Sequence, residues 1–102
     1  MINFFKNDDH GFAFWLRDNP SGYVFDDFGG INPQLKKLHQ SRCKQVRSPN
    51  SISAKTHIRK VCCASLDELV SWIDKNFGPE KEGYFPCEHC HPFRSTEDST
   101  WN

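Results

Sequence analysis

One short stretch of this 102-residue chain decides its fold: residues 83–92, which read Gly-Tyr-Phe-Pro-Cys-Glu-His-Cys-His-Pro. The Cys-x-x-Cys spacing of Cys87 and Cys90 brings two thiolates within reach of one metal ion. The flanking prolines stiffen the turn and reduce the entropy lost when a metal binds. Upstream, His39 and Cys43 stand four positions apart, a spacing that places both side chains on one side of a turn. The two half-sites together predict a structural metal site.

Zinc is the metal that this set of ligands favours, because it takes four nitrogen or sulfur ligands in a tetrahedron. A Cys-x-x-Cys pair preceded by a His-x-x-x-Cys pair matches known zinc spacings, so the predicted ligands are His39, Cys43, Cys87 and Cys90. His91 is the runner-up to His39. Neighbouring strand residues face opposite ways, so at most one of Cys62 and Cys63 can replace a ligand, and both are expected to be buried or idle thiols.

Haem is a rival cofactor for the same residues. Cys87, Cys90 and His91 spell Cys-x-x-Cys-His, the attachment signature of c-type haem. Haem attachment needs an exported chain, and the first residues lack the basic start and apolar stretch of a secretory signal. The only methionine is Met1, so the distal ligand would have to be a histidine. These points favour zinc over haem.

Bulk composition predicts a single domain with a ring-rich core. Aromatic residues make up 14% of the chain, including nine Phe and three Trp. We expect one zinc-binding domain over residues 1–93 and a flexible polar tail over residues 94–102. Without a signal, five cysteines indicate metal binding in a reducing compartment, so a cytoplasmic location is predicted. No Ser-His-Asp or paired-carboxylate arrangement stands out, and we expect a protein that is not an enzyme.

Residue patterns predict an α+β fold with about three short strands and two helices. Phe12, Trp15 and Leu16 share one face of a helix over residues 10–19, although alternation over the same stretch also allows a strand. Strands are predicted over residues 23–25, 34–39 and 56–64. A Ser-x-x-Glu capping box at residues 65–68 begins the second helix, and Gly-Pro at residues 78–79 ends it.

A net charge of zero conceals a segregated distribution of charge. Residues 1–27 carry a balance of −3 and residues 67–102 a balance of −5, whereas residues 28–66 contain no acid at all. That middle block has a balance of +8, from Lys36, Lys37, Arg42, Lys44, Arg47, Lys55, Arg59 and Lys60. Such a block suits phosphate or an acidic partner. The alternative is a solvated face that acidic residues elsewhere in the fold neutralise.

Residues 39–92 resemble the zinc-binding module of the bacterial alkylation-repair protein Ada and its relatives, some of them in phages. The second half-site, residues 83–92, matches nearly position for position; the helix start at residues 65–68 and the spacing of His39 and Cys43 also match. The resemblance implies a zinc-stabilised fold. In Ada the first ligand is a cysteine thiolate that accepts a methyl group, but here that position is His39, so methyl transfer is not implied.

These features predict a small non-enzymatic zinc module that binds DNA or RNA. The expected phosphate contacts, which bring affinity without sequence choice, are Lys36, Lys37, Arg42, Lys44, Arg47, Arg59 and Lys60. The alternative is a bacterial or phage interaction module that docks on an enzyme and regulates it. Its acidic contacts would be Asp8, Asp9, Asp26, Asp27, Glu80, Glu82, Glu88, Glu97 and Asp98.

Overall fold

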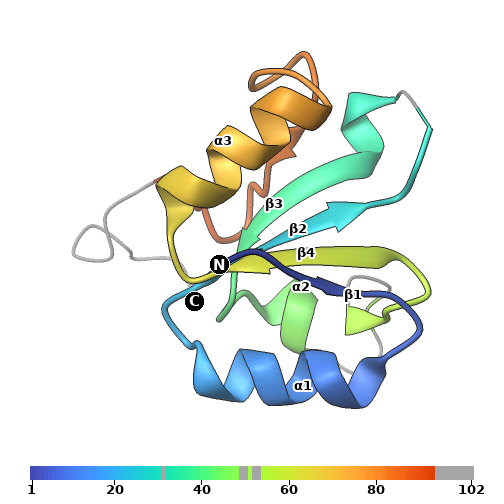
Figure 1. Ribbon diagram of the computed structural model, residues 1–102, viewed down its shortest axis with the longest axis vertical. Helices are drawn as coiled ribbons and strands as arrows, with labels where there is room; N and C mark the ends of the chain where they lie inside the picture. The colour runs from blue at the N-terminus through green and yellow to red at the C-terminus, as the bar shows by residue number, and fades with distance from the viewer. Residues whose placement is uncertain (31, 49–50, 52–53, 94–102) are drawn as a thin grey trace.

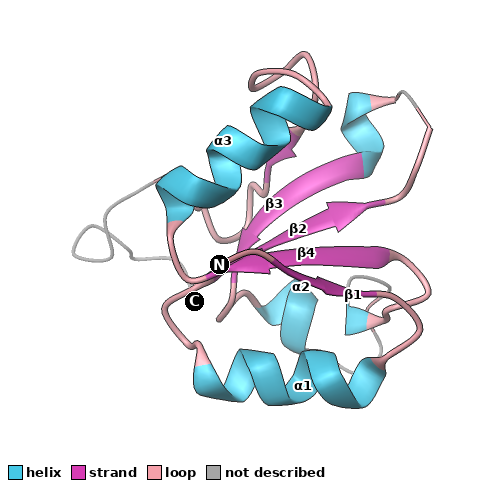
Figure 2. Cartoon of the chain, in the orientation of Figure 1, coloured by secondary structure: helices cyan, strands magenta, loops and turns pink. Residues whose placement is uncertain are grey.

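The computed structural model describes residues 1–30, 32–48, 51 and 54–93. In these residues a five-stranded sheet has α3 on one face and α1 and α2 on the other (Figures 1 and 2). The predicted α+β class is therefore confirmed. The predicted tail over residues 94–102 lies outside the described residues.

The sheet has the strand order β1-β4-β2-β3-β5. Three pairings, β1 with β4, β4 with β2, and β2 with β3, are antiparallel, while β3 and β5 are parallel. The two edge strands, β1 and β5, were not predicted, because segments of three and two residues are too short to show alternation. The bounds are β1 Asn3–Phe5, β2 Tyr23–Asp27, β3 Lys36–Gln40, β4 Arg59–Cys63 and β5 Phe85–Pro86.

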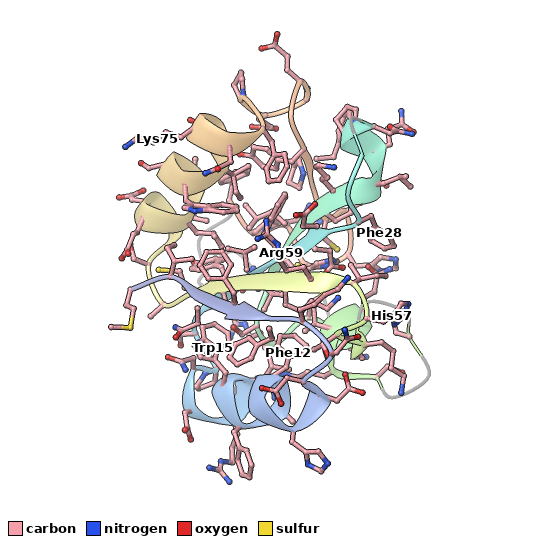
Figure 3. The ribbon with its side chains drawn as sticks, turned by 45° about the vertical axis from the view of Figure 1, so that its right-hand side comes forward. Phe12, Trp15, Phe28, His57, Arg59 and Lys75 are labelled. Carbon is pink, nitrogen blue, oxygen red and sulfur yellow. The ribbon has the colours of Figure 1, made fainter. Side chains whose placement is uncertain are left out.

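Helix α1 (Asp9–Asp18) confirms the helical interpretation of the first apolar pattern. The Asp8 side chain caps it by accepting a hydrogen bond from the Gly11 backbone N–H at 2.9 Å. Phe12 and Leu16 are buried, and Figure 3 shows Phe12 and Trp15 on the side of α1 that faces the sheet. Helical spacing therefore packs one face of α1 against the sheet.

Helix α3 (Leu66–Asn76) begins and ends close to the predicted positions. The Ser65 side chain accepts from the Glu68 N–H at 3.2 Å, but the Glu68 carboxylate pairs with the N-terminal ammonium of Met1 at 3.0 Å. The capping box is therefore only half formed. At the other end Gly78 adopts φ 120°, a conformation that favours glycine, and its N–H donates to the Ile73 carbonyl.

Two apolar clusters lie on opposite faces of the sheet. Val24 and Cys62 belong to the cluster with Phe12 and Leu16, whereas their neighbours Phe25 and Cys63 belong to the cluster with α3. Strand alternation thus separates Cys62 from Cys63 as predicted. Two short helices complete the fold: the 3-10 helix η1 (Pro33–Leu35) before β3 and α2 (Lys44–Arg47) after it.

Candidate metal centre

Four side chains from distant parts of the chain meet at one end of β3. His39 lies on β3 itself, and Cys43 is the residue that precedes α2. Parallel pairing of β5 with β3 sets Pro86 opposite Leu38, and the Cys87 N–H donates to the Leu38 carbonyl at 2.8 Å. This pairing places Cys87 beside His39. The His91 N–H then donates to the Cys87 carbonyl at 3.0 Å, closing the turn that carries Cys90.

The ligand atoms of His39, Cys43, Cys87 and Cys90 all lie within 4.8 Å of one another, and all four residues are buried. The Sγ atoms of Cys43 and Cys87 are 3.9 Å apart. A tetrahedral zinc ion with Zn–S bonds of about 2.3 Å separates two sulfurs by about 3.8 Å. The spacing therefore fits one ion held by four protein ligands.

The two nitrogens of the His39 ring have different surroundings. Nε2 lies 3.2 Å from the Asp26 Oδ2. Nδ1 is buried and finds no hydrogen-bond partner among the described residues. Leaving a buried polar nitrogen unpaired is costly, so an unpaired nitrogen on a histidine that clusters with three cysteines is the arrangement expected of a metal ligand.

Backbone amides support the sulfurs. The Gln40 N–H donates to the Cys90 Sγ at 3.2 Å and the His89 N–H to the Cys87 Sγ at 3.4 Å. The Gln40 side chain also donates to the Cys90 carbonyl at 2.7 Å, which ties the end of β3 to the turn. Hydrogen bonds from amides to sulfur favour the thiolate over the thiol, and the thiolate is the form that binds metal.

Electrostatics treat these side chains differently: the charged forms of Cys87 and His39 are favoured, whereas hydrogen bonds with Cys43 and Cys87, together with burial, raise the pKa of the Cys90 thiol. Hydrogen bonds from the thiols of Cys43 and Cys90, together with His39, hold the pKa of Cys87 well below its ordinary value despite burial. Burial opposes a charge on His39, but its hydrogen bond to Asp26 and the nearby sulfurs of Cys43 and Cys87 outweigh burial, so the pKa of His39 is raised. Cys87 is therefore the cysteine whose thiolate, the form that binds metal, is most favoured.

The other predicted ligand candidates lie outside this group of four. Cys62 and Cys63 are buried in the two apolar clusters, and burial raises the pKa of Cys62. His91 is half-buried and has φ 49°. In the described part of the chain neither Cys62, Cys63 nor His91 joins the cluster. The burial of Cys87 and Cys90 against His39 and Cys43 also disfavours haem, whose attachment requires both sulfurs to reach the porphyrin edge.

Two of the seven residues predicted to contact nucleic acid are not accessible from the surface. Lys36 and Lys60 are buried, with 1% and 0% of their surface exposed. Lys36 Nζ donates to the carbonyls of Gly29 and Gly30, and Lys60 Nζ donates to Asp26 Oδ1 at 2.7 Å. A phosphate cannot reach either ammonium group in this fold, so the prediction was wrong for these two lysines.

The other five predicted contacts reach the surface to different degrees. Arg59 pairs with Asp27 at 2.8 Å on the α3 side of the sheet (Figure 3). Arg47 is exposed but donates to the carbonyls of Ser41 and Leu16. Lys37 lies over the Phe85 ring, and Arg42 and Lys44, on either side of Cys43, are exposed. Lys37 lies two residues before His39 on β3, and Arg42 and Lys44 flank Cys43, so these three residues are called the basic rim of the metal centre.

Asp26 was also predicted as an acidic contact for docking on a partner. It cannot make such a contact, because it has no exposed surface. Burial acts to raise its pKa, but the hydrogen bond from His39 and the charge of Lys60 outweigh burial and keep the pKa of Asp26 below its ordinary value. Aspartate is common in turns, which is why the predicted strand stops at residue 25 although β2 continues to Asp27. Strand alternation could have predicted the burial of Asp26. It lies two residues after Val24, and residues two apart in a strand lie on the same face of the sheet. Glu97 and Asp98 lie outside the described residues.

Comparisons of the chain with protein-family models, curated proteins and solved structures found no match. The resemblance to the Ada-type module stays a prediction, carried by the residues quoted for it. Among the described residues, no helix has the length and apolar character needed to cross a membrane.

Proposed function

We propose that this protein is a small non-enzymatic module in which a structural zinc ion joins residues 85–91 to the central sheet. The observation that carries the proposal is the buried cluster of His39 with three cysteines, in which Nδ1 of His39 has no hydrogen-bond partner among the described residues. One imidazole and three thiolates suit zinc better than magnesium or calcium, which prefer oxygen. Because all four ligands come from the protein and are buried, no position is left for a substrate, as in structural zinc sites.

The resemblance to the Ada-type module agrees with a zinc site but does not extend the proposal to the reaction of Ada. Both half-sites of that pattern meet in space here, as His39 with Cys43 and Cys87 with Cys90. With His39 in place of the reactive cysteine, the proposal contains zinc binding and leaves methyl transfer out.

The two candidate histidines give a direct test. His39→Ala should weaken zinc binding more than about 100-fold, because even partners that only orient a ligand contribute about 10- to 100-fold. His91→Ala, which removes a half-buried imidazole from the same turn, should change zinc affinity little. Competition with a chromophoric chelator measures both affinities. A strong loss in His91→Ala with none in His39→Ala would show that the ligand is misassigned.

The specific partner that we propose is a nucleic acid, bound at the basic rim of Lys37, Arg42 and Lys44. Arg42 and Lys44 flank a metal ligand, so the ion would fix their backbone. Lys37 shares an opening of about 210 Å³ with Cys87, Gln45 and His89, although Glu88 also lines it. Phosphate contacts from such a rim would supply affinity that does not depend on sequence.

Replacing the rim residues tests the partner. Binding should weaken with salt because each phosphate contact releases counterions, and the triple change of Lys37, Arg42 and Lys44 to Gln should flatten the slope by about one unit per lost contact. The matched control changes Arg17, Lys55 and Lys75 to Gln, which removes the same charge from exposed sites elsewhere. Fluorescence anisotropy with labelled single strands and duplexes over a salt series gives both slopes. No binding at low salt would reject the nucleic-acid partner and favour docking on a protein.

A further inference from the structure

A buried carboxylate connects the metal centre to the middle of the sheet. Asp26 lies on β2, between Lys60 on β4 and β3, which carries His39. Its Oδ1 accepts from Lys60 Nζ at 2.7 Å, and its Oδ2 lies 3.2 Å from His39 Nε2. Asp26, Lys60 and His39 each have at most 1% of their surface exposed. The three groups form one continuous polar row in the interior of the domain.

The row determines which nitrogen of His39 can bind a metal. An ionised carboxylate accepts hydrogen bonds and cannot donate them, and the ammonium of Lys60 beside Asp26 favours the ionised form. The Nε2 atom must therefore carry the ring proton and donate it to Asp26. In the neutral ring the remaining lone pair is then on Nδ1, the buried nitrogen that has no hydrogen-bond partner among the described residues, in a side chain that clusters with three cysteines.

We propose that Asp26 is a positioning residue of the metal centre, which fixes the tautomer and orientation of His39 so that Nδ1 is the ligand. This inference rests on the proposed zinc site. Asp26 does not touch the metal; it acts through the imidazole, as carboxylates behind metal-bound histidines do. Lys60 holds the other oxygen of Asp26, so the carboxylate has a donor on each side and cannot rotate without losing both.

Asp26→Asn tests the proposal while keeping the shape of the side chain. With its oxygen held by Lys60, the new amide would present an NH₂ donor to Nε2, and His39 would have to place its proton on Nδ1. Zinc affinity should fall about 10- to 100-fold, the usual loss for a partner of this kind. Asp27→Asn is the matched control. Asp27 pairs with Arg59 at 2.8 Å and lies 3.8 Å from Lys36, away from the metal centre, so its replacement should leave zinc affinity nearly unchanged.

A second measurement reports the tautomer itself and needs no variant. In zinc-loaded protein with ¹⁵N-labelled histidine, the ring nitrogens of His39 should show a protonated Nε2 and a metal-bound Nδ1. Zinc bound at Nε2, or Asp26→Asn binding zinc as tightly as the unchanged chain, would overturn the inference and leave the zinc site standing. If Asp26→Asn does not fold, the ¹⁵N spectrum alone decides. A chain that binds no zinc would instead overturn the proposed function, and this inference with it.

Discussion

Replacing Cys87 with Ser is expected to leave the domain largely unfolded. Structural zinc contributes an apparent free energy of about 10 kcal/mol or more, and the whole stability of a domain is only about 5–15 kcal/mol. Cys87 is buried between Cys43, whose sulfur is 3.9 Å away, and the His89 amide. A serine hydroxyl in this position is a poor zinc ligand, so most of the metal's contribution is lost. Cys90→Ser should behave in the same way.

Cys63→Ser provides the matched control for this expectation. Cys63 is equally buried, but it lies in the cluster on the α3 face of the sheet, away from the metal centre. Burying a hydroxyl there should cost only about 1–3 kcal/mol. Thermal unfolding followed by circular dichroism compares the three variants. A Cys87→Ser protein that melts at the temperature of the unchanged chain would contradict the proposed ligand set.

Removing the metal with a chelator should have the second largest effect. A ligand that binds only the folded chain stabilises it by RT ln(1 + [L]/Kd), so each tenfold rise in free zinc above Kd should add about 1.4 kcal/mol to the free energy of unfolding. The melting temperature should therefore fall when the chelator is added and rise again with zinc, whereas magnesium should not restore it.

Hydrogen exchange would locate the effect of metal removal. The amides of Gln40 and Cys87 connect β3 to the cysteine turn, through the Cys90 sulfur and the Leu38 carbonyl respectively. Both should lose protection first, because the zinc ion closes the loop that holds them. Equal melting temperatures and equal protection with and without chelator would mean that the four side chains pack together without a metal.

Features that depend on local spacing could be predicted from the sequence. Cys87 and Cys90 are positioned by a single turn, and the helix α3 by its cap and its apolar period, so each is encoded within a short window. His39 and Cys43 could also be predicted as members of the cluster, because a His-x-x-x-Cys spacing indicates a second half-site when a Cys-x-x-Cys pair is present.

The features that were missed depend on pairing between distant strands. In the sheet, Asp26 is opposite Lys60 and Asp27 is opposite Arg59. Charges that look segregated along the chain are therefore partners in space, and the middle block is less basic at the surface than its composition indicates. No window of sequence contains this information, since it is set by the register of β2 against β4.

The polar row behind His39 was missed for the same reason. A lysine and an aspartate 34 positions apart give no sign of contact until β2 and β4 are paired. Burying such a pair is favourable only when its remaining hydrogen bonds are made, and here His39 supplies the missing donor. The metal centre and the sheet interior thus share one set of hydrogen bonds.

The most direct measurement is the mass of the purified protein under native conditions, together with its zinc content by elemental analysis. We predict one zinc ion per chain, lost under denaturing conditions and retained when Cys63 is replaced. A native mass equal to that of the polypeptide alone, with elemental analysis finding no zinc after purification without chelators and after incubation with added zinc, would contradict the proposed metal centre.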